Sequence, residues 1–182
     1  MIEQINELKI PGCFKIKLKS TVDNRGKFKK IFNNEYFKKY SLNTIWQEDF
    51  FSISNKNVLR GMHFQIPPYH QYKLISCMKG ILIDVILDLR ENSKSYKQFL
   101  FYELNSNDNE LIYLSPGIAH GFLSLIDETI TYYKVSSMYS NKNDKGIFWN
   151  SFGYNWPISN PIISSRDNNL IHLKDYESDF KW

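Results

Sequence analysis

The stretch that decides the fold is ILIDVILDLR, residues 81–90. Apolar side chains occupy all of its odd-numbered positions and also the even-numbered positions 82 and 86, so a strand formed by these residues would have apolar side chains on both faces. This is expected for a strand in the middle of a packed barrel. Asp84 interrupts the run, and a carboxylate there is costly unless it has a hydrogen-bond or charge partner. A structural salt bridge and a carboxylate aimed into a pocket both meet that condition.

Short apolar runs separated by turn residues flank this stretch on both sides. Residues 13–19 (CFKIKLK) alternate apolar side chains with lysines, which predicts a half-buried strand. A turn at residues 23–26 (DNRG), a short run at 28–32 and one short helix at 33–40 follow. The further predicted strands are residues 45–53, 58–64, 72–78, 81–89, 99–104, 111–114, 122–126 and 129–135. This pattern predicts an all-β sandwich or barrel, with IFWN, NWPISNP and SSRDNN in C-terminal loops and short turns laid over the sheet.

The composition is that of a globular protein. A length of 182 residues suits one domain, and we expect a single domain over residues 1–182. The net charge of +4 is spread along the chain, which weakly favours an anionic small ligand and gives little support to a nucleic-acid partner. Cys13 and Cys77 have no CxxC spacing and are expected to be buried or half-buried thiols rather than a disulfide framework.

No targeting or membrane segment is evident. The N-terminal residues MIEQINELKIPG carry acids and lack a basic start followed by an apolar run. No stretch approaches the roughly 18 apolar residues that span a bilayer. The sequence therefore predicts a cytoplasmic protein without a membrane partner.

Residues 59–74, LRGMHFQIPPYHQYKL, hold two of the four histidines. Metal-binding double-stranded β-helix proteins usually present His-x-His, then a carboxylate and a further histidine. Here His63 lacks the neighbouring histidine, and His70 lies seven residues away across two prolines, so a site would also need His120. The spacing therefore disfavours a metal.

Proton transfer is the stronger interpretation of the same stretch. His63 suits abstraction of an activated C–H proton if a carboxylate orients its second nitrogen. Lys73 could neutralise the resulting oxyanion, while Arg60 and Arg25 could hold phosphate oxygens. A single histidine in a strand is also common as a structural residue. Moreover, Arg60 and His63 are three residues apart, so a bulge or twist is needed to bring both into one pocket.

Eight motifs occur in order along the chain. They are NVLRGMHFQ (57–65), QYKL (71–74), DVILDLR (84–90), SPGIAHGF (115–122), YYKV (132–135), IFWN (147–150), NWP (155–157) and PIISSRD (161–167). From the DNRG turn to Asp167 the chain closely resembles the dTDP-4-dehydrorhamnose 3,5-epimerase family. The resemblance implies a cupin jelly roll (a double-stranded β-helix) with a few short peripheral helices, no metal and no cofactor. It also implies a homodimer that acts on a nucleotide-diphosphate 4-keto sugar.

Carried over by position, the resemblance assigns roles to individual residues. His63 would be the general base, Asp167 its orienting carboxylate, Tyr133 the acid on the opposite face and Lys73 the group that stabilises the enolate oxygen. The substrate-binding residues would be Arg25, Arg60, Gln47, Asp84, His120 and Phe50. From the sequence alone, Tyr133 could equally be core and Asp167 a solvated loop charge. His70 has no counterpart in the motifs and is expected at the surface or rim.

The implied chemistry suits these residue types. A 4-keto group acidifies the hydrogens on C3 and C5, so abstraction needs no cofactor. Inversion requires a base and an acid on opposite sides of the sugar, and His63 and Tyr133 would supply them.

The chain departs from the family pattern at positions associated with the base and sugar. The family's QDN reads EDF here, which places Phe50 where an asparagine is expected. The other departures are Thr21 and Lys27 for aromatic residues, Lys30 for a glutamate, Tyr72 for a glycine and Met138 for a tyrosine. The proton-transfer residues are retained, so the departures affect the substrate rather than the reaction class.

The sequence thus predicts an isomerase: an epimerase of C3, C5 or both in a nucleotide-linked 4-keto sugar, serving surface polysaccharide (capsule or lipopolysaccharide) synthesis. The nearest alternative is the same chemistry, with inversion at C3 alone or at both carbons, on a GDP-linked 4-keto heptose or a CDP-linked deoxysugar. A sugar-nucleotide 3,4-ketoisomerase is a further alternative, against which the retained Tyr133 and Asp167 argue. A non-catalytic sugar-nucleotide-binding cupin would be indicated by loss of His63, Lys73 or Tyr133, and none is lost.

Overall fold

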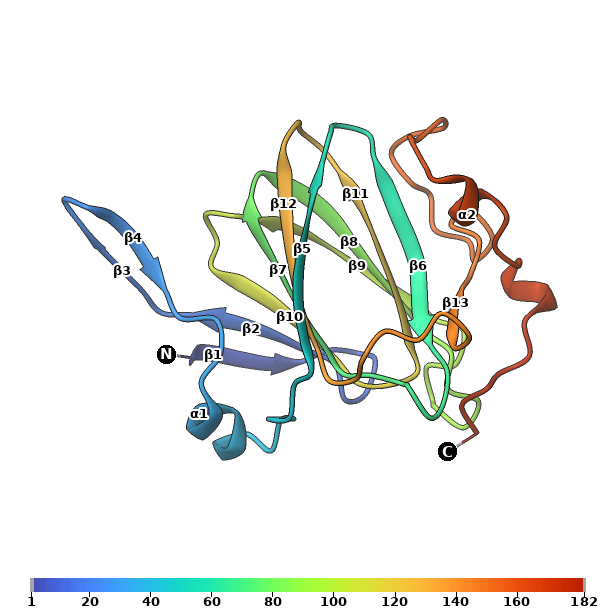
Figure 1. Ribbon diagram of the computed structural model, residues 1–182, viewed down its shortest axis with the longest axis horizontal. Coiled ribbons are helices and arrows are strands. Elements are labelled where there is room, and N and C mark those ends of the chain that lie inside the picture. The colour runs from blue at the N-terminus through green and yellow to red at the C-terminus, as the bar shows by residue number, and fades with distance from the viewer. Residues whose placement is uncertain (1, 182) are drawn as a thin grey trace.

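Two antiparallel β-sheets face each other in the computed structural model, which describes residues 2–181 (Figure 1). The larger sheet has the strand order β1 (Ile2–Glu7), β2 (Phe14–Leu18), β10 (Glu110–Leu114), β7 (Lys73–Lys79), β12 (Thr129–Val135) and β5 (Glu48–Ser54). The smaller sheet has the order β13 (Asp144–Gly146), β6 (Leu59–Gln65), β11 (Ile118–Ser124), β8 (Ile81–Asp88) and β9 (Phe99–Asn105). From β5 to β13 the chain changes sheet at every connection except β8–β9. This alternation is that of a jelly roll, and the predicted all-β class is confirmed.

The strand β8 is apolar on both faces because it is covered on both faces. Leu82 and Ile86 point between the two sheets and form part of the inter-sheet core. Val85 and Leu87 point the other way and pack in a second core with aromatic residues of the C-terminal segment. Since β8 also lies between β11 and β9, it has no free edge, as its sequence predicted.

The C-terminal segment, residues 147–181, covers the outer face of the smaller sheet beside β6 and β13 (Figure 1). We call it the C-terminal cover. It consists mainly of loops and turns, with α2 (Ser165–Asn168) and the 3-10 helix η1 (Leu173–Asp175). The prediction of loops and short turns laid over the sheet is therefore confirmed. Its buried aromatic residues replace the second sheet that would otherwise cover this face.

The N-terminal region adds a hairpin and a helix. The strands β3 (Ser20–Asp23) and β4 (Gly26–Lys29) form a separate two-stranded sheet that projects away from the others (Figure 1). The predicted helix is α1 (Asn34–Lys39), and the Asn33 side chain caps it by accepting a hydrogen bond from the Tyr36 N–H. The short run predicted at residues 28–32 is a strand only as far as Lys29, where β4 ends.

Some strand boundaries differ from the prediction. The strand β11 begins at Ile118 rather than at residue 122, because Ala119 and Gly121 are small residues that fit where β11 packs closely against its neighbours. Cys13 and Cys77 are buried free thiols, as expected. No helix within residues 2–181 is long and apolar enough to cross a membrane.

Candidate active site

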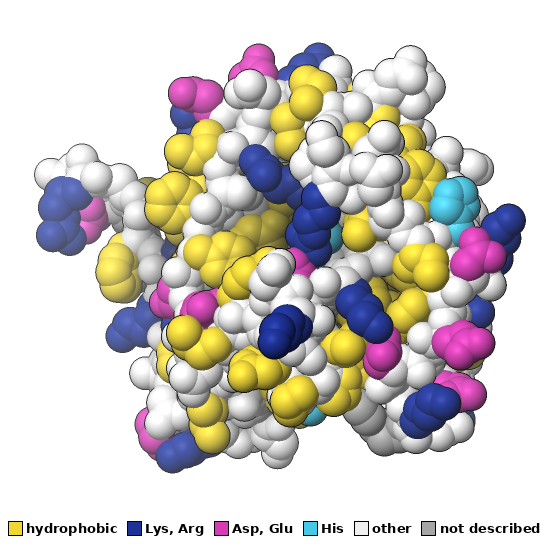
Figure 2. Space-filling model, turned by 45° about the vertical axis from the view of Figure 1, so that its right-hand side comes forward, with side chains coloured by type: hydrophobic (Ala, Val, Ile, Leu, Met, Phe, Trp, Pro, Cys, Tyr) yellow, Lys and Arg dark blue, Asp and Glu magenta, His cyan; other side chains and the backbone are white. Residues whose placement is uncertain are grey.

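A cavity of about 360 Å³ opens between the two sheets. Figure 2 shows the molecular surface as hollowed, with hydrophobic side chains inside the hollow and lysine and arginine side chains at its edge. The cavity-lining residues come from both sheets: Glu48, Phe50, Ser52, Arg60, His63, Phe64, Gln65, Gln71, Lys73, His120, Tyr133, Val135, Tyr139 and Asp144.

A bulge in β6 brings Arg60 and His63 to the same cavity. On β11, His120 pairs with His63 and Phe122 pairs with Arg60, so two residues of β6, Gly61 and Met62, lie opposite the single residue Gly121 of β11. Gly61 makes this possible, with a φ of +133° and a position so close to β11 that a Cβ would lie 2.4 Å from the Gly121 Cα. The bulge that the sequence required is therefore present.

The His63 ring is held by Asp167. The two side chains are joined by a hydrogen bond of 2.7 Å between Nε2 and Oδ1, and the other carboxylate oxygen accepts the Gly61 N–H at 3.2 Å. Asp167 lies on α2, where the Ser164 side chain accepts its N–H, and it is buried rather than solvated. Burial alone would raise the pKa of Asp167, but the hydrogen bond and charge of His63 and the Gly61 N–H lower it below its ordinary value. With its proton on Nε2, the imidazole keeps a lone pair on its other nitrogen.

A second histidine–carboxylate pair lies on the same sheet. His120 Nε2 and Asp84 Oδ2 are 2.6 Å apart, and both side chains are buried. His120 lines the cavity, while Asp84 is behind it and outside the lining residues. Asp84 thus has the hydrogen-bond partner that a buried carboxylate requires. It influences the cavity by holding His120 and through its charge, which affects the pKa of Tyr133 and Lys73.

Lys73 and Tyr133 come from the opposite sheet, on β7 and β12. Lys73 is buried, and its Nζ donates a hydrogen bond of 2.9 Å to the His63 carbonyl oxygen. Burial lowers the pKa of Lys73 to about 8, against the opposing effects of Asp144 and Asp84. Burial, reinforced by the charge of Asp84, raises the pKa of Tyr133 well above its ordinary value. The phenol therefore stays protonated across the physiological range.

Some of the remaining predicted residues line the cavity and others lie outside it. Arg60 lines the cavity and donates through Nε to Ser54 Oγ at 3.1 Å, and Phe50 also lines it. Gln47 is outside the lining and exposed. Arg25 lies in the turn of the projecting hairpin, paired with Asp23 at 2.6 Å, and this chain does not bring it to its own cavity. His70, expected at the surface or rim, lies in the β6–β7 connection outside the lining residues and is half-buried.

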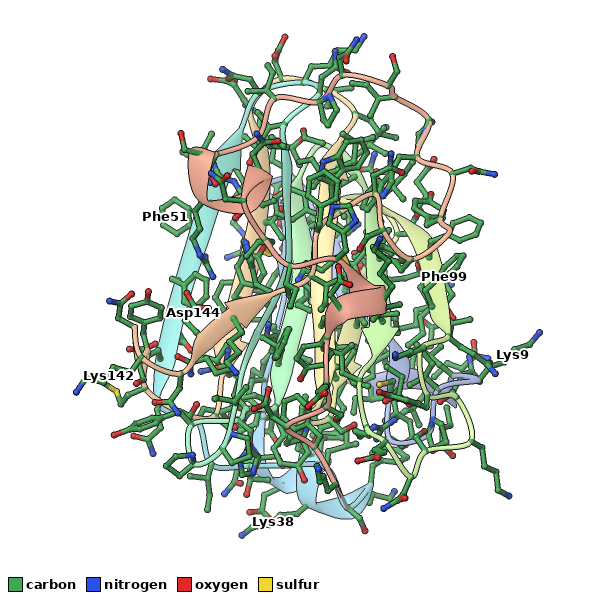
Figure 3. The ribbon with its side chains drawn as sticks, turned by 90° about the vertical axis from the view of Figure 1, so that its right-hand side faces the viewer. Lys9, Lys38, Phe51, Phe99, Lys142 and Asp144 are labelled. Atoms are coloured by element: carbon green, nitrogen blue, oxygen red, sulfur yellow. The ribbon has the colours of Figure 1, made fainter. Side chains whose placement is uncertain are left out.

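Sequence reasoning missed several lining residues at one end of the cavity. Asp144 on β13, labelled in Figure 3, forms an ion pair of 2.7 Å with Arg166 and accepts a hydrogen bond of 3.2 Å from the Tyr139 hydroxyl. Glu48 accepts the Tyr139 N–H at 3.2 Å. Gln65 and Gln71 lie within two of the recognised motifs, and this position could have identified them as cavity residues. Tyr139 and Asp144 lie in a polar loop and a very short strand, where no sequence pattern singled them out.

The cavity side chains form two separate histidine–carboxylate pairs. Among residues 2–181, no group of three or more His, Cys, Asp or Glu side chains is placed to hold a metal ion. His63 and His120 are each engaged by their own aspartate. This donor set does not match the ligand clusters of metal sites.

The fold and the site together define a class of protein. A jelly roll with a histidine–aspartate pair on one sheet, a protonated tyrosine on the other and a buried lysine beside them carries the groups that acid–base enzymes use. The model of the dTDP-4-dehydrorhamnose 3,5-epimerase family matches residues 7–175. The chain belongs to this family and is an epimerase.

Individual relatives agree with this assignment. The dTDP-4-dehydrorhamnose 3,5-epimerase of Shigella flexneri is 34% identical over 163 residues, which cover 88% of this chain and 90% of that protein. The crystal structure of the Bacillus anthracis enzyme, with TDP and PPi bound, has a TM-score of 0.90 at 33% identity and covers 93% of this chain and 99% of that one. A 3′-monoepimerase from Streptomyces bikiniensis, in complex with dTDP-quinovose, has a TM-score of 0.87 at 26% identity and covers 93% and 87%.

Proposed function

We propose that the protein epimerises C3, C5 or both of a nucleotide-diphosphate-linked 4-keto sugar, without a cofactor. The observation that carries the proposal is the opposition of His63, with Asp167 behind it, and Tyr133 across one cavity. Both named relatives with bound ligands hold thymidine nucleotides or a thymidine-linked sugar, which makes a dTDP-linked sugar the first candidate substrate.

The proposed reaction begins at His63. Its free lone pair takes the proton from C3 or C5, and the electron pair of that C–H bond moves to the 4-keto oxygen to give an enolate. Asp167 is ionised and stabilises the imidazolium that forms. The ammonium of Lys73 stabilises the enolate oxygen in a site sheltered from water.

Tyr133 completes the inversion. Its hydroxyl delivers a proton to the same carbon from the opposite sheet, and the enolate collapses back to the ketone. The raised pKa suits this role, because a phenol that stays neutral has a proton to give. Solvent then reprotonates the tyrosine and removes the proton from His63.

The nucleotide is the open part of the proposal. Two cavity positions where the family pattern has glutamine and asparagine carry Glu48 and Phe50 here. The two changes replace one amide with a carboxylate and the other with an apolar ring, so the hydrogen bonds offered to the substrate differ. We therefore keep a GDP-linked 4-keto heptose or a CDP-linked deoxysugar as the second candidate substrate class.

We also propose a homodimer. Arg25, predicted to contact substrate, is outside the cavity of its own chain and could reach only the cavity of another copy. The edge strand of the larger sheet on the cavity side is β5, which exposes Phe51 and Ile53. Light scattering should give twice the chain mass, and replacing both residues with aspartate should give monomers. A monomeric wild-type protein would contradict the dimer.

The decisive experiment is solvent exchange. The protein is incubated in D₂O with 4-keto sugars linked to dTDP, GDP and CDP, and deuterium at C3 and C5 is measured by NMR. Exchange with one member of the panel identifies the reaction and the nucleotide together. Absence of exchange with all three would rule out the proposed function.

Two variants and a chelator test the roles. His63→Asn should abolish exchange at both carbons, while Tyr133→Phe should permit exchange and block net inversion. Full inversion in Tyr133→Phe would remove Tyr133 from its role. Treatment with EDTA should leave the rate unchanged, and a loss restored by a divalent metal would indicate a metal site.

We place this activity in the cytoplasm, where sugars are activated with nucleoside triphosphates, as a step toward surface polysaccharide.

A further inference from the structure

Phe50 and Tyr133 form an unusual pair within the cavity. They are directly opposite each other in the β5–β12 register. Their rings are stacked, with centroids 4.9 Å apart and an interplanar angle of 18°. Both line the cavity, whereas the next residue, Phe51, points outward from β5 (Figure 3). The stack therefore belongs to the site and not to the outer surface of the sheet.

The Tyr133 ring is held by a second aromatic contact. His120 meets it edge to face, with ring centroids 5.9 Å apart and an interplanar angle of 74°. A ring with one partner stacked on its face and another at an angle has little freedom to rotate about its side-chain bonds. The direction of the Tyr133 hydroxyl is thus determined by its neighbours, and Phe50 is the one that the family pattern does not supply.

Phe50 is also placed to control water at Tyr133. The phenylalanine is 47% exposed, so it lies at the border between the cavity and solvent, while Tyr133 is further inside. An asparagine at this position would be smaller and would offer an amide that binds water. The phenylalanine instead covers one face of the tyrosine with an apolar ring.

We propose that Phe50 positions Tyr133 for proton delivery, and so sets the fraction of proton abstractions that end in inversion rather than in return of the proton to the same face. The inference rests on the proposed function, in which Tyr133 is the acid. Phe50 is a positioning residue in this scheme, since it acts through the tyrosine. Its contribution is specific to this chain, because the family pattern has asparagine there.

The test is the ratio of net inversion to deuterium exchange, measured for each carbon on the substrate that the wild-type enzyme accepts. Phe50→Asn should lower the ratio by roughly tenfold or more, since small misplacement of a reacting group is costly, and should change KM much less. Phe50→Tyr keeps a ring for stacking and should restore the ratio. Phe101→Asn is the matched control, because Phe101 is an exposed residue of the edge strand β9 outside the lining residues, and its substitution should leave the ratio unchanged.

The pH dependence of the ratio separates positioning from simple packing. In the wild type it should stay flat on the alkaline side, because burial keeps Tyr133 protonated. In Phe50→Asn it should fall as the pH rises, since water then reaches the phenol. Thermal unfolding checks that each variant is folded.

The outcomes are distinguishable. A Phe50→Asn ratio equal to that of the Phe101→Asn control overturns the inference, as does a rise in KM with an unchanged ratio. Both results leave the proposed function intact, provided that the wild type exchanges and Tyr133→Phe does not invert. If the wild type shows no exchange with any nucleotide, the proposed function fails instead.

Discussion

Lys73 shows how burial changes the pKa of a single residue. The lysine lies among buried strands and is held by the His63 carbonyl oxygen rather than by a carboxylate at hydrogen-bond distance. Desolvation penalises its charged form and lowers its pKa to about 8. A cation with little solvent around it acts strongly on an enolate oxygen, since few waters compete for that charge.

This pKa predicts an alkaline limit on activity. The rate of solvent exchange should fall as the pH rises above about 8, because Lys73 then loses the charge that stabilises the enolate. Lys73→Gln should lower the rate by roughly 10²-fold, the scale of losing one oxyanion donor, and its profile should lack this limb. The measurement is the pH profile of kcat/KM for exchange.

The lowered pKa of Lys73 also makes the stability of the protein depend on pH. Between pH 8 and 10.5 the unfolded chain binds a proton at Lys73 that the folded chain does not. The contribution of this residue to the free energy of unfolding therefore becomes more favourable as the pH rises through that window. Urea unfolding of wild type and Lys73→Gln at several pH values should show this trend, and parallel curves would contradict it.

At the scale of elements, the site depends on the contact between β6 and β11. Gly61 and Gly121 meet across this pair, and a Cβ on Gly121 would lie 2.7 Å from Met62 Sδ and 2.9 Å from the Arg60 oxygen. The close approach lets the bulge form, and the bulge points both Arg60 and His63 inward. The two glycines therefore act on the site through the geometry of the strands.

Gly61→Ala should lower the free energy of unfolding by about 2–4 kcal/mol, the combined scale of backbone strain and overpacking. Its Cβ would meet backbone atoms of β11, which cannot move aside cheaply. The matched control is Gly26→Ala, which has a similar φ of +117° but nothing within 4 Å of the added Cβ. Urea denaturation of both variants separates the contact from the dihedral cost, and equal losses would refute the role of the contact.

The sequence predicted elements better than their boundaries. The strand β12 was predicted from Thr129 to Val135 and is found there. The strand β1 was not predicted. The strand β11 was predicted to begin too late, at residue 122, because Gly121 resembles a turn residue. A glycine can serve a turn or a close strand contact, and only the neighbouring strand decides which.

At the scale of the whole molecule, the C-terminal cover makes the jelly roll asymmetric. It seals the outer face of the smaller sheet with aromatic residues and also carries Asp167 to His63. One segment thus provides core packing and part of the site. Damage to its packing should therefore lower stability, and it should lower activity only if α2 is displaced.

Phe180→Ala tests this separation. Phe180 is fully buried in the cover, so its truncation should cost about 3–5 kcal/mol of unfolding free energy. Phe101→Ala, at an exposed position of β9, should cost about 1 kcal/mol or less. Exchange activity per folded molecule should match the wild type in both variants at low temperature. A large activity loss in folded Phe180→Ala would show that the cover and the site are more tightly coupled.

The sequence by itself determined the class of fold and the family, because the period of its apolar runs and the order of its motifs are local properties. It also named His63, Lys73, Tyr133 and Asp167 through those motifs. The tertiary structure alone decided how they meet. It pairs Asp167 with His63 across 104 positions, places Asp84 behind His120 and leaves Arg25 outside its own cavity. The physical reason is that burial, desolvation and strand register arise between segments distant in the chain, and these set the pKa values and geometry on which the chemistry depends.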